Sequence, residues 1–448
     1  MKRTALLFLS LLLILSASAC GKEIADTPAG SSSLTIEQTS PASQTSEIGS
    51  GDIDSDTVAE TELEQTISYD TSAEHSATVM KNGDDLVGGA YTATGTDESA
   101  IEASGNVKAS VTGAIIKKSS GKASSVDDSN FKGVNSGVRV YGNAEVTLKD
   151  CVIEANAENA TGVFAYQNGV IRISDCTVTV TGNGAGGVQV AGGGTLYGNN
   201  LTVTTESKAA IRSDRGGGIM VIDGGTYTSN GKDGCPVIYS TADITVRNAD
   251  GVSTKSRAII IEGKNSVTIE NCTLSGNDQS TKAGSVHSNI MLYQSTSGDA
   301  KEGTSTLTAT NCKLISQSGA MFYCTNTSSV INLKSSELIL SDDGGLLIVS
   351  KGRWGKDGKN GGKCTFNAVD QALQGNITVD SISSLNFNLN NSTFEGAILS
   401  EGNVNLTLDS GSKWILTANS SISSLTGDTS GIELNGYTLL VNGNEYKK

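Results

Sequence analysis

The chain contains two stretches that decide its fold: VRVYGNAEVTLKDCVIEA at residues 138–155 and VFAYQNGVIRISDCTVTV at residues 163–180. The second stretch begins 25 residues after the first. In both, apolar and polar residues alternate, which is typical of a half-buried β-strand and not of a helix. A repeat of this size cannot bury an apolar face alone, so neighbouring repeats must stack on one another.

The repeat continues along the chain in two series. The first series consists of apolar residues within short strands: Val138, Val163, Val188, Ile211, Val237, Ile259, Ile290, Met321 and Leu347. The second consists of short polar residues that end alternating strands: Asp150, Asp175, Asn199, Asp223, Asn248, Asn271, Asn311, Ser335 and Asp370. Asp and Asn tolerate left-handed backbone and bond to nearby amides, so the second series predicts one sharp bend in every repeat.

These patterns predict an all-β protein, a right-handed parallel β-helix (a solenoid) of about a dozen coils, preceded by a disordered tether. The composition agrees with this, because 53 of the 448 residues are Gly and only 4 % are aromatic. Only two histidines occur, which nearly excludes a histidine-based triad. The formal net charge is −15, and without a basic face we expect no nucleic-acid partner.

Residues 1–20 are typical of a secretory signal peptide. Lys2 and Arg3 precede an apolar run, and small residues lead to Cys20. This ending resembles a bacterial lipoprotein signal, in which Cys20 is lipidated, although Ala17 stands where Leu is usual. The resemblance implies an exported lipoprotein at the bacterial cell surface, attached to the membrane through its lipid anchor only. Ordinary signal cleavage beside an incidental cysteine is the alternative.

Residues 21–79 contain 12 acidic side chains and one lysine, and they are rich in Ser and Thr. Such a segment cannot bury enough apolar surface to offset the entropy of ordering. We therefore expect three parts: a signal peptide at 1–20, a disordered acidic tether at 21–79 and the β-helix at 80–448.

Cysteine follows the polar residue of the bend in four repeats, at Cys151, Cys176, Cys272 and Cys312. The pairs Cys151/Cys176 and Cys272/Cys312 fall on consecutive coils, so the sequence allows either disulfides or stacked buried thiols. Cys235, Cys324 and Cys364 show no evident partner in the sequence.

Together these features resemble the right-handed β-helix surface proteins of bacteria, in the pectate-lyase-like superfamily. The segments 210–218 (AIRSDRGGG) and 414–443 resemble adhesin-like or carbohydrate-binding members. The resemblance implies the fold more strongly than an activity, because this fold hosts lyases, hydrolases, adhesins and inert stalks.

The outward-facing residues next to the first series are candidates for sugar contacts. Aromatic side chains offer stacking faces with a polar group, and arginine binds carboxylates through two hydrogen bonds. The candidates are Arg139, Tyr141, Phe164, Tyr166, Gln189, Arg212, Asp214, Arg215 and Trp354. Trp354 lies in a loop, residues 351–363, with five basic groups and one acid. The alternative is that these are ordinary outward strand residues and a solvated loop.

In the later coils the same rule places apolar residues on the outer face: Ile238, Ile260, Met291, Phe322 and Ile348. Such a stripe should not lie bare in water. The longer segments after Leu274, Tyr293 and Ser350 are therefore expected to cover it.

We predict a monomeric cell-surface module that binds a polysaccharide or cell-wall glycan without cleaving it. No catalytic residue or metal site is predicted, and no cofactor, apart from Ca²⁺ if the protein is instead a pectate-lyase-like polysaccharide lyase. For such a lyase Arg212, Asp214, Arg215 and Glu262 are the nearest set, with fewer carboxylates than a Ca²⁺ site needs. An inert structural spacer is the third alternative.

Overall fold

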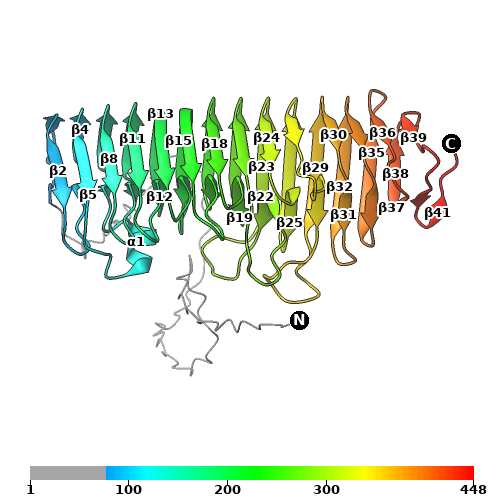
Figure 1. Ribbon diagram of the computed structural model, residues 1–448, viewed down its shortest axis with the longest axis horizontal. Coiled ribbons are helices and arrows are strands. Elements are labelled where there is room, and N and C mark those ends of the chain that lie inside the picture. The colour runs from blue at the N-terminus through cyan, green and yellow to red at the C-terminus, as the bar shows by residue number, and fades with distance from the viewer. Residues whose placement is uncertain (1–76) are drawn as a thin grey trace, which may run out of the picture. The chain divides into compact units, whose positions relative to one another are not determined.

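The computed structural model describes residues 77–448, and their short parallel strands stack into the long sheets seen in Figure 1. Successive strands visit three flat faces in turn, which we call sheets I, II and III, and each circuit adds one coil. The register shows the repeat directly, because Val138 pairs with Val163 and Val163 with Val188. The chain thus forms the predicted right-handed parallel β-helix.

Sheet I has 12 strands. They are β3 (Ile101–Ser104), β6 (Val138–Tyr141), β9 (Val163–Tyr166), β12 (Val188–Ala191), β14 (Ile211–Ser213), β16 (Ile238–Ser240), β19 (Ile259–Glu262), β22 (Ser288–Tyr293), β25 (Ala320–Thr325), β28 (Leu347–Val349), β31 (Ile377–Val379) and β34 (Ile398–Ser400). This number agrees with the predicted dozen coils.

Sheets II and III are two faces of one 22-stranded sheet, joined because β13 (Gly194–Thr205) and β15 (Gly218–Ser229) run through the bend between them. The other strands of sheet II are β1 (Asp85–Val87), β4 (Lys108–Thr112), β7 (Glu145–Lys149), β10 (Val170–Ser174), β17 (Asp243–Arg247), β20 (Ser266–Glu270), β23 (Thr304–Thr310), β26 (Ser328–Lys334), β29 (Lys363–Val369), β32 (Ser384–Asn390), β35 (Asn403–Leu408) and β38 (Ser424–Gly427). Those of sheet III are β2 (Ala90–Ala93), β5 (Ile115–Lys118), β8 (Val152–Ala155), β11 (Thr177–Val180), β18 (Asp250–Ser253), β21 (Thr273–Gly276), β24 (Lys313–Ser316) and β27 (Glu337–Ile339).

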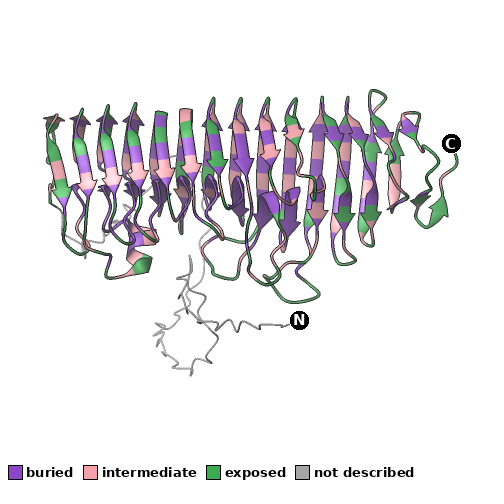
Figure 2. Ribbon diagram, in the orientation of Figure 1, coloured by how far each residue is buried: buried purple, intermediate pink, exposed green. Residues whose placement is uncertain are grey.

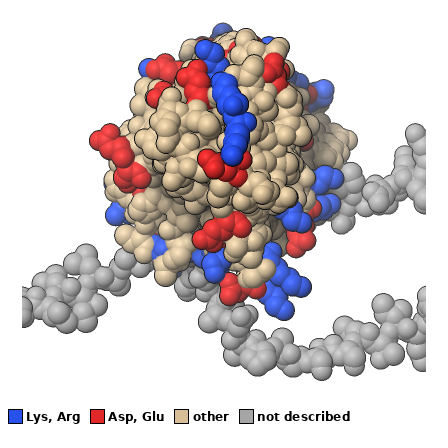
Figure 3. Space-filling view, turned by 90° about the vertical axis from the view of Figure 1, so that its right-hand side faces the viewer, with Lys and Arg blue, Asp and Glu red and all other residues tan. Residues whose placement is uncertain are grey.

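The last coils use smaller sheets. One contains β30 (Ala372–Gln374), β33 (Thr393–Glu395), β36 (Lys413–Ile415) and β39 (Ile432–Glu433); the other contains β37 (Ser420–Ile422), β40 (Leu439–Val441) and β41 (Asn444–Glu445). β41 pairs antiparallel with β40, so the end coil turns back on itself as a closing element. Seen from this end in Figure 3, acidic and basic side chains are interspersed on a mostly uncharged surface.

The polar series lies at the bend between sheets II and III, as predicted. Seven of its nine members have left-handed backbone: Asp150, Asp175, Asn248, Asn271, Asn311, Ser335 and Asp370. At the other two coils the prediction is wrong by one residue, because Asn200 and Gly224 hold the left-handed position and Asn199 and Asp223 lie one residue before it, within β13 and β15. The amides link successive coils, for example Asn271 Nδ2 to Asn248 Oδ1 at 3.1 Å.

Buried residues recur in every coil, as the purple bands of Figure 2 show, and one apolar core of such residues runs from Met80 to Leu439. In the later coils it contains a continuous row of aromatic rings, with neighbouring centroids 5.3–6.2 Å apart: Phe322, Phe366, Phe387, Phe394 and Trp414. The expected outward position of Phe322 is therefore wrong. Ile290 pairs with Phe322 and Ile211 with Ile238, so Phe322 and Ile238 point inward and Tyr323 and Tyr239 take the outward positions.

Four long connections flank sheet I. Residues 119–137 and 277–287 lead into it from sheet III, and residues 294–303 and 350–362 lead from it to sheet II. The first contains α1 (Val126–Lys132), the one helix of the described residues. Ser125 caps its start by accepting a hydrogen bond from Asp128 N, and Gly133 ends it with a φ of 72°. Figure 1 shows α1 and the long loops along the same edge of the stack.

The predicted signal peptide (1–20), Cys20 and most of the tether, residues 21–76, lie outside the described residues. Residues 77–80 already pair with the first coil, where Met80 N donates to Glu102 O at 2.8 Å. Ordered backbone pairing thus begins slightly before residue 80. Within residues 77–448 no helix is long and apolar enough to cross a membrane.

Candidate functional site

Four of the predicted candidates on sheet I share one outer column. Strand register aligns Arg139 with Phe164, Phe164 with Gln189, and Gln189 with Arg212. Tyr239 continues this column in the next coil. The strand register therefore agrees with the predicted alignment of these four side chains.

This column is not an open groove, because α1 lies over its N-terminal part. Arg139, Tyr141, Phe164, Gln189 and Asp214 are all buried, with at most 3 % of each residue exposed. A Cβ atom added to Gly133 would lie 2.4 Å from Phe164 Cγ, so the backbone that ends α1 rests on the Phe164 ring. The expectation that these five residues face solvent is wrong. The helix segment contacts Phe164, Arg139 and Gln189, whereas Tyr141 donates to Glu102 and Asp214 pairs with Arg212.

Two of these side chains donate hydrogen bonds to the backbone of α1. Arg139 Nε donates to Lys132 O and Gln189 Nε2 donates to Asn130 O, each at 2.8 Å. The last carbonyl groups of a helix have no partner within the helix and attract positive donors. Arg139 also meets Glu102 at 3.4 Å, and both side chains are at least nine-tenths buried. Arg139 and Gln189 thus anchor α1 to sheet I.

Arg212 and Asp214 form an ion pair at 2.7 Å at the margin of the helix. Gln189 donates to the same Asp214 oxygen at 3.3 Å. The Arg212 guanidinium also lies 4.7 Å from the centre of the Tyr239 ring. Arg212 is therefore held in place on two sides, and 13 % of its side chain is exposed.

Arg215 connects the helix to the loop 294–303. Its guanidinium lies 4.1 Å from the centre of the Phe131 ring and meets Asp299 at 2.6 Å. About half of its side chain is exposed. Tyr166, the remaining strand candidate, is half-buried, and its ring lies against the backbone of Gly192.

Glu262 is the centre of a buried polar cluster that the sequence did not predict. The carboxylate is 1 % exposed and accepts hydrogen bonds from the hydroxyl groups of Tyr239, Tyr293 and Ser295. Burial, followed by the neighbouring carboxylate of Glu262, raises the pKa of Tyr239 and of Tyr293 well above the usual value for tyrosine. Both tyrosines therefore stay protonated and act as hydrogen-bond donors.

Trp354 packs on this cluster and is half-buried. Its ring centroid lies 4.6 Å from that of Tyr293, and Arg353 lies 4.7 Å from the Trp354 ring centre. Together with Val286 and Ile348 it covers the apolar residues Ile260, Met291 and Tyr323. The prediction that long loops cover the outer apolar stripe is confirmed, and Trp354 is one of the covering residues.

A hollow of about 690 Å³ opens beside this cluster, where the loops 294–303 and 350–362 approach the turn after β25. Its lining is rich in hydroxyl and amide groups: Gln294, Ser295, Thr296, Gly298, Ala300, Glu302, Gly303, Thr304, Asn326, Thr327, Ser328, Gly355 and Lys356. Gln294 is 7 % exposed, and its Oε1 atom has no hydrogen-bond partner among the described residues. We call this space the loop hollow.

The sequence signal for the loop hollow was weak. Longer segments after Tyr293 and Ser350 were recognised, but nothing in their composition shows that they meet across the turn that contains Asn326 and Thr327. Asn326 Nδ2 donates to Gln294 O at 2.8 Å, which fixes the turn against the first loop. The contact joins residues that are 32 positions apart.

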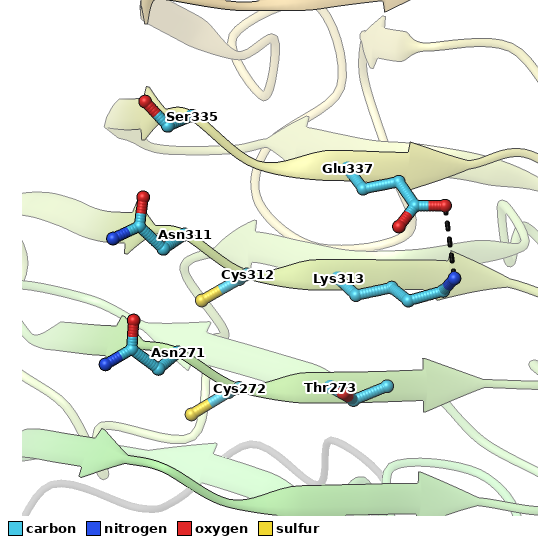
Figure 4. A pocket seen from close by; sticks show the side chains of 8 residues that line it. All are labelled: Asn271, Cys272, Thr273, Asn311, Cys312, Lys313, Ser335 and Glu337. Carbon is cyan, nitrogen blue, oxygen red and sulfur yellow. Dashed lines mark hydrogen bonds and ion pairs between the residues drawn. The ribbon is translucent and has the colours of Figure 1, made fainter.

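A second hollow, of about 360 Å³, lies on the polar bend (Figure 4). Its lining includes Asn271, Asn311 and Ser335, with Lys313 and Glu337 joined by an ion pair of 3.1 Å at one side. Its polar groups belong to the regular ladder of the bend, so they serve the stacking of coils.

The carboxylates named for a lyase are engaged by donors of the protein itself. Asp214 accepts from Arg212 and Gln189, and Glu262 accepts from three hydroxyl groups. Among residues 77–448 no group of three or more His, Cys, Asp or Glu side chains is arranged to hold a metal ion.

Comparison with known families agrees with the architecture. Residues 72–205 match the family described as right handed beta helix region. A comparison with curated proteins gives no match. The matched residues cover the early coils and α1, whereas the loop hollow lies later in the chain.

Proposed function

We propose that the chain is an exported lipoprotein whose β-helix binds carbohydrate at the cell surface without cleaving it, with the loop hollow as the binding site. The observation that carries this proposal is the hydroxyl- and amide-rich lining of a hollow of about 690 Å³. Sugar ligands present many hydroxyl groups, and a few fixed polar groups in a preformed concave site give such ligands their orientation.

The surroundings of the hollow favour a preorganised site. The β-strands that carry the two loops, β22, β23, β28 and β29, each pair with a strand of the coil on either side. The loop 294–303 is tied to Arg215 through Asp299, and the loop 350–362 is tied to sheet I through Trp354. A site that is already ordered loses less entropy on binding.

The charged residues in and around the loop hollow limit the class of glycan that we propose as its ligand. Lys356 lines the hollow, and its loop, residues 351–363, carries five basic groups and one acid. Glu302 is the acidic residue of the lining. We therefore propose a neutral or acidic cell-wall polysaccharide as the partner, bound by a monomer that is attached to the membrane through the lipid on Cys20.

The test is a glycan array with the full-length protein, with and without Ca²⁺, beside an assay for unsaturated uronide products on polygalacturonate. The variant Thr304→Val/Ser328→Ala removes two exposed hydroxyl groups of the hollow. Thr177→Val removes an exposed strand hydroxyl on sheet III and is the matched control. We expect binding to fall about tenfold or more in the first variant and to be unchanged in the control, with no product formed.

Other outcomes decide between the alternatives. Ca²⁺-dependent product that disappears in Arg212→Ala would support a lyase. Binding that survives the loss of both hollow hydroxyl groups would place the site elsewhere. No binding and no product would support a structural spacer.

A further inference from the structure

Two thiols face one another in the interior. Cys324 belongs to β25 of sheet I and Cys364 to β29 of sheet II. Their Sγ atoms lie 3.6 Å apart. Both residues are buried, with 0 and 2 % exposed. The contact joins residues that are 40 positions apart in the chain, which is why the sequence showed no partner for either.

The cysteines at the bend are arranged differently. Each donates its thiol proton to the carbonyl two residues earlier in its own chain segment, at 3.1–3.3 Å: Cys151 to Lys149, Cys176 to Ser174, Cys272 to Glu270 and Cys312 to Thr310. In Figure 4 the sulfur atoms of Cys272 and Cys312 point in the same direction from stacked strands. Cys235 donates to Ser207 O at 2.7 Å. Cys151 and Cys176, and likewise Cys272 and Cys312, also hydrogen-bond to one another through their thiols. What distinguishes Cys324 and Cys364 is that their sulfur atoms face one another across the interior, from sheets I and II.

We propose that Cys324 and Cys364 are a modification site at which an interior disulfide forms during folding outside the cytoplasm. All seven cysteines of residues 77–448 are thiols in the structure. A disulfide requires the two sulfur atoms to approach by about 1.5 Å. We expect rotation of the two side chains about their Cα–Cβ bonds to supply this movement.

The position of this pair relates it to the loop hollow. β25 leads directly into Asn326 and Thr327, which line the hollow, and Cys364 follows the loop 350–362. A disulfide would enclose β26, β27, β28 and that loop in one covalent ring. It would hold both sides of the hollow in place, although it does not depend on what the hollow binds.

The reaction is thiol–disulfide exchange with a small-molecule or protein disulfide as oxidant. One cysteine, as thiolate, attacks the oxidant, and a mixed disulfide forms while the first thiol of the oxidant leaves. The second cysteine then attacks the protein sulfur of the mixed disulfide. The Sγ–Sγ bond forms, the second thiol of the oxidant leaves, and the two protons of the cysteines pass to the two released thiols.

The burial of Cys324 and Cys364 and the contact between their thiols determine when the disulfide can form. Hydrogen bonding with Cys324, followed by burial, raises the pKa of Cys364 well above the usual value for a thiol. The thiolate is the attacking species, so the folded, buried pair reacts slowly. Oxidation should therefore accompany folding, while the pair is still accessible.

The test is to refold the full-length chain from denaturant in a buffer of oxidised and reduced glutathione, block remaining thiols, and map linked peptides without reduction. We expect one linked peptide that joins Cys324 to Cys364, with the loss of two hydrogen masses. The same peptide is expected in protein exported by a host with an oxidising envelope. Cys272 and Cys312 are the matched control, because they too are 40 residues apart and buried.

Two variants complete the design. Cys364→Ser should abolish the linked peptide, whereas Cys312→Ser should leave it unchanged. The oxidised parent should show a thermal midpoint about 5 °C higher than the reduced parent, since a cross-link restricts the unfolded chain. If all seven thiols stay open to blocking after refolding and export, or if the linked peptide joins Cys272 to Cys312, the proposal is wrong.

Discussion

Arg139 Nε donates to the backbone carbonyl of Lys132 at 2.8 Å, so a side chain of sheet I completes the last turn of α1. The same guanidinium pairs with Glu102 at 3.4 Å in a buried setting. One arginine thus joins the helix, the outer face of the sheet and the first coil. The donor groups of Arg139 that could bind an acidic sugar are thus engaged by Lys132 and Glu102 within the protein.

Arg139→Met is therefore expected to lower the free energy of unfolding by about 3 kcal/mol, because the buried carboxylate of Glu102 loses its ion pair with Arg139 and keeps the neutral donor Tyr141. Urea unfolding measures the change, and hydrogen exchange of residues 126–132 should increase. Arg172→Met is the control, since Arg172 meets Glu145 at 2.9 Å with half of its side chain exposed, and its loss should cost less than about 1 kcal/mol. Equal losses in the two variants would contradict the anchoring role of Arg139.

The bend predicts a contrast between two substitutions at one position. Asn311 has a φ of 53°, a region in which a Cβ atom costs about 1–2 kcal/mol and glycine costs little. Asn311→Ala should be about 1 kcal/mol less stable than Asn311→Gly, as measured by urea unfolding. The opposite order would contradict the left-handed backbone as the reason for the residue at this bend.

Alkaline pH should destabilise the fold through its buried tyrosines. The pKa of Tyr239 and that of Tyr293 are raised by burial and by Glu262, so the unfolded state loses protons first as the pH rises above about 10. Their contribution is fully present below that pH and is lost as the pH rises toward the folded-state pKa. Tyrosinate absorbance should show these two groups ionising only together with unfolding, and their ionisation in the folded protein would contradict the assignment.

Trp354→Ala should loosen the loop 350–362 without unfolding the coils. The ring packs on Tyr293 and supports Arg353, and aromatic contacts of this kind contribute about 1 kcal/mol. Cleavage by trypsin after Lys356 or Lys359 should become about tenfold faster at an unchanged thermal midpoint. Trp414→Phe is the contrast, because Trp414 is fully buried; it should lower the midpoint and leave the loop as resistant as in the parent.

The coil architecture could be predicted because apolar and polar residues alternate within each short strand and the repeats follow one another at a regular spacing. The prediction of which residues point inward was wrong where two apolar residues are adjacent. Val237-Ile238 and Met321-Phe322 are uninterrupted pairs, and without a polar neighbour a one-residue shift exchanges the inner and outer faces. The strand register corrects both, with Ile238 and Phe322 inside.

The site could be predicted only in part, because it depends on contacts between distant segments. The sequence placed four residues in the correct column: Arg139, Phe164, Gln189 and Arg212. Their surroundings, however, depend on the seven-residue helix α1, which belongs to the connection 119–137. Ser125 and Gly133 are its sequence signals, but a helix this short has no clear apolar periodicity. The loop hollow is formed by three segments that meet only after the coils have stacked.

The in-register stacking of coils also bears on how such a chain can change in evolution. Each coil pairs only with its two neighbours, so duplication or loss of one whole coil lengthens or shortens the stack by about 4.8 Å and leaves the remaining strand pairs intact. Between β3 and β22 lie coils that carry neither the loops of the hollow nor the end coil. Gene duplication within this stretch would displace the hollow along the axis in fixed steps. A coil inserted between β14 and β22 would also separate Arg215 from Asp299, so the hollow would keep its lining residues and lose this ion pair.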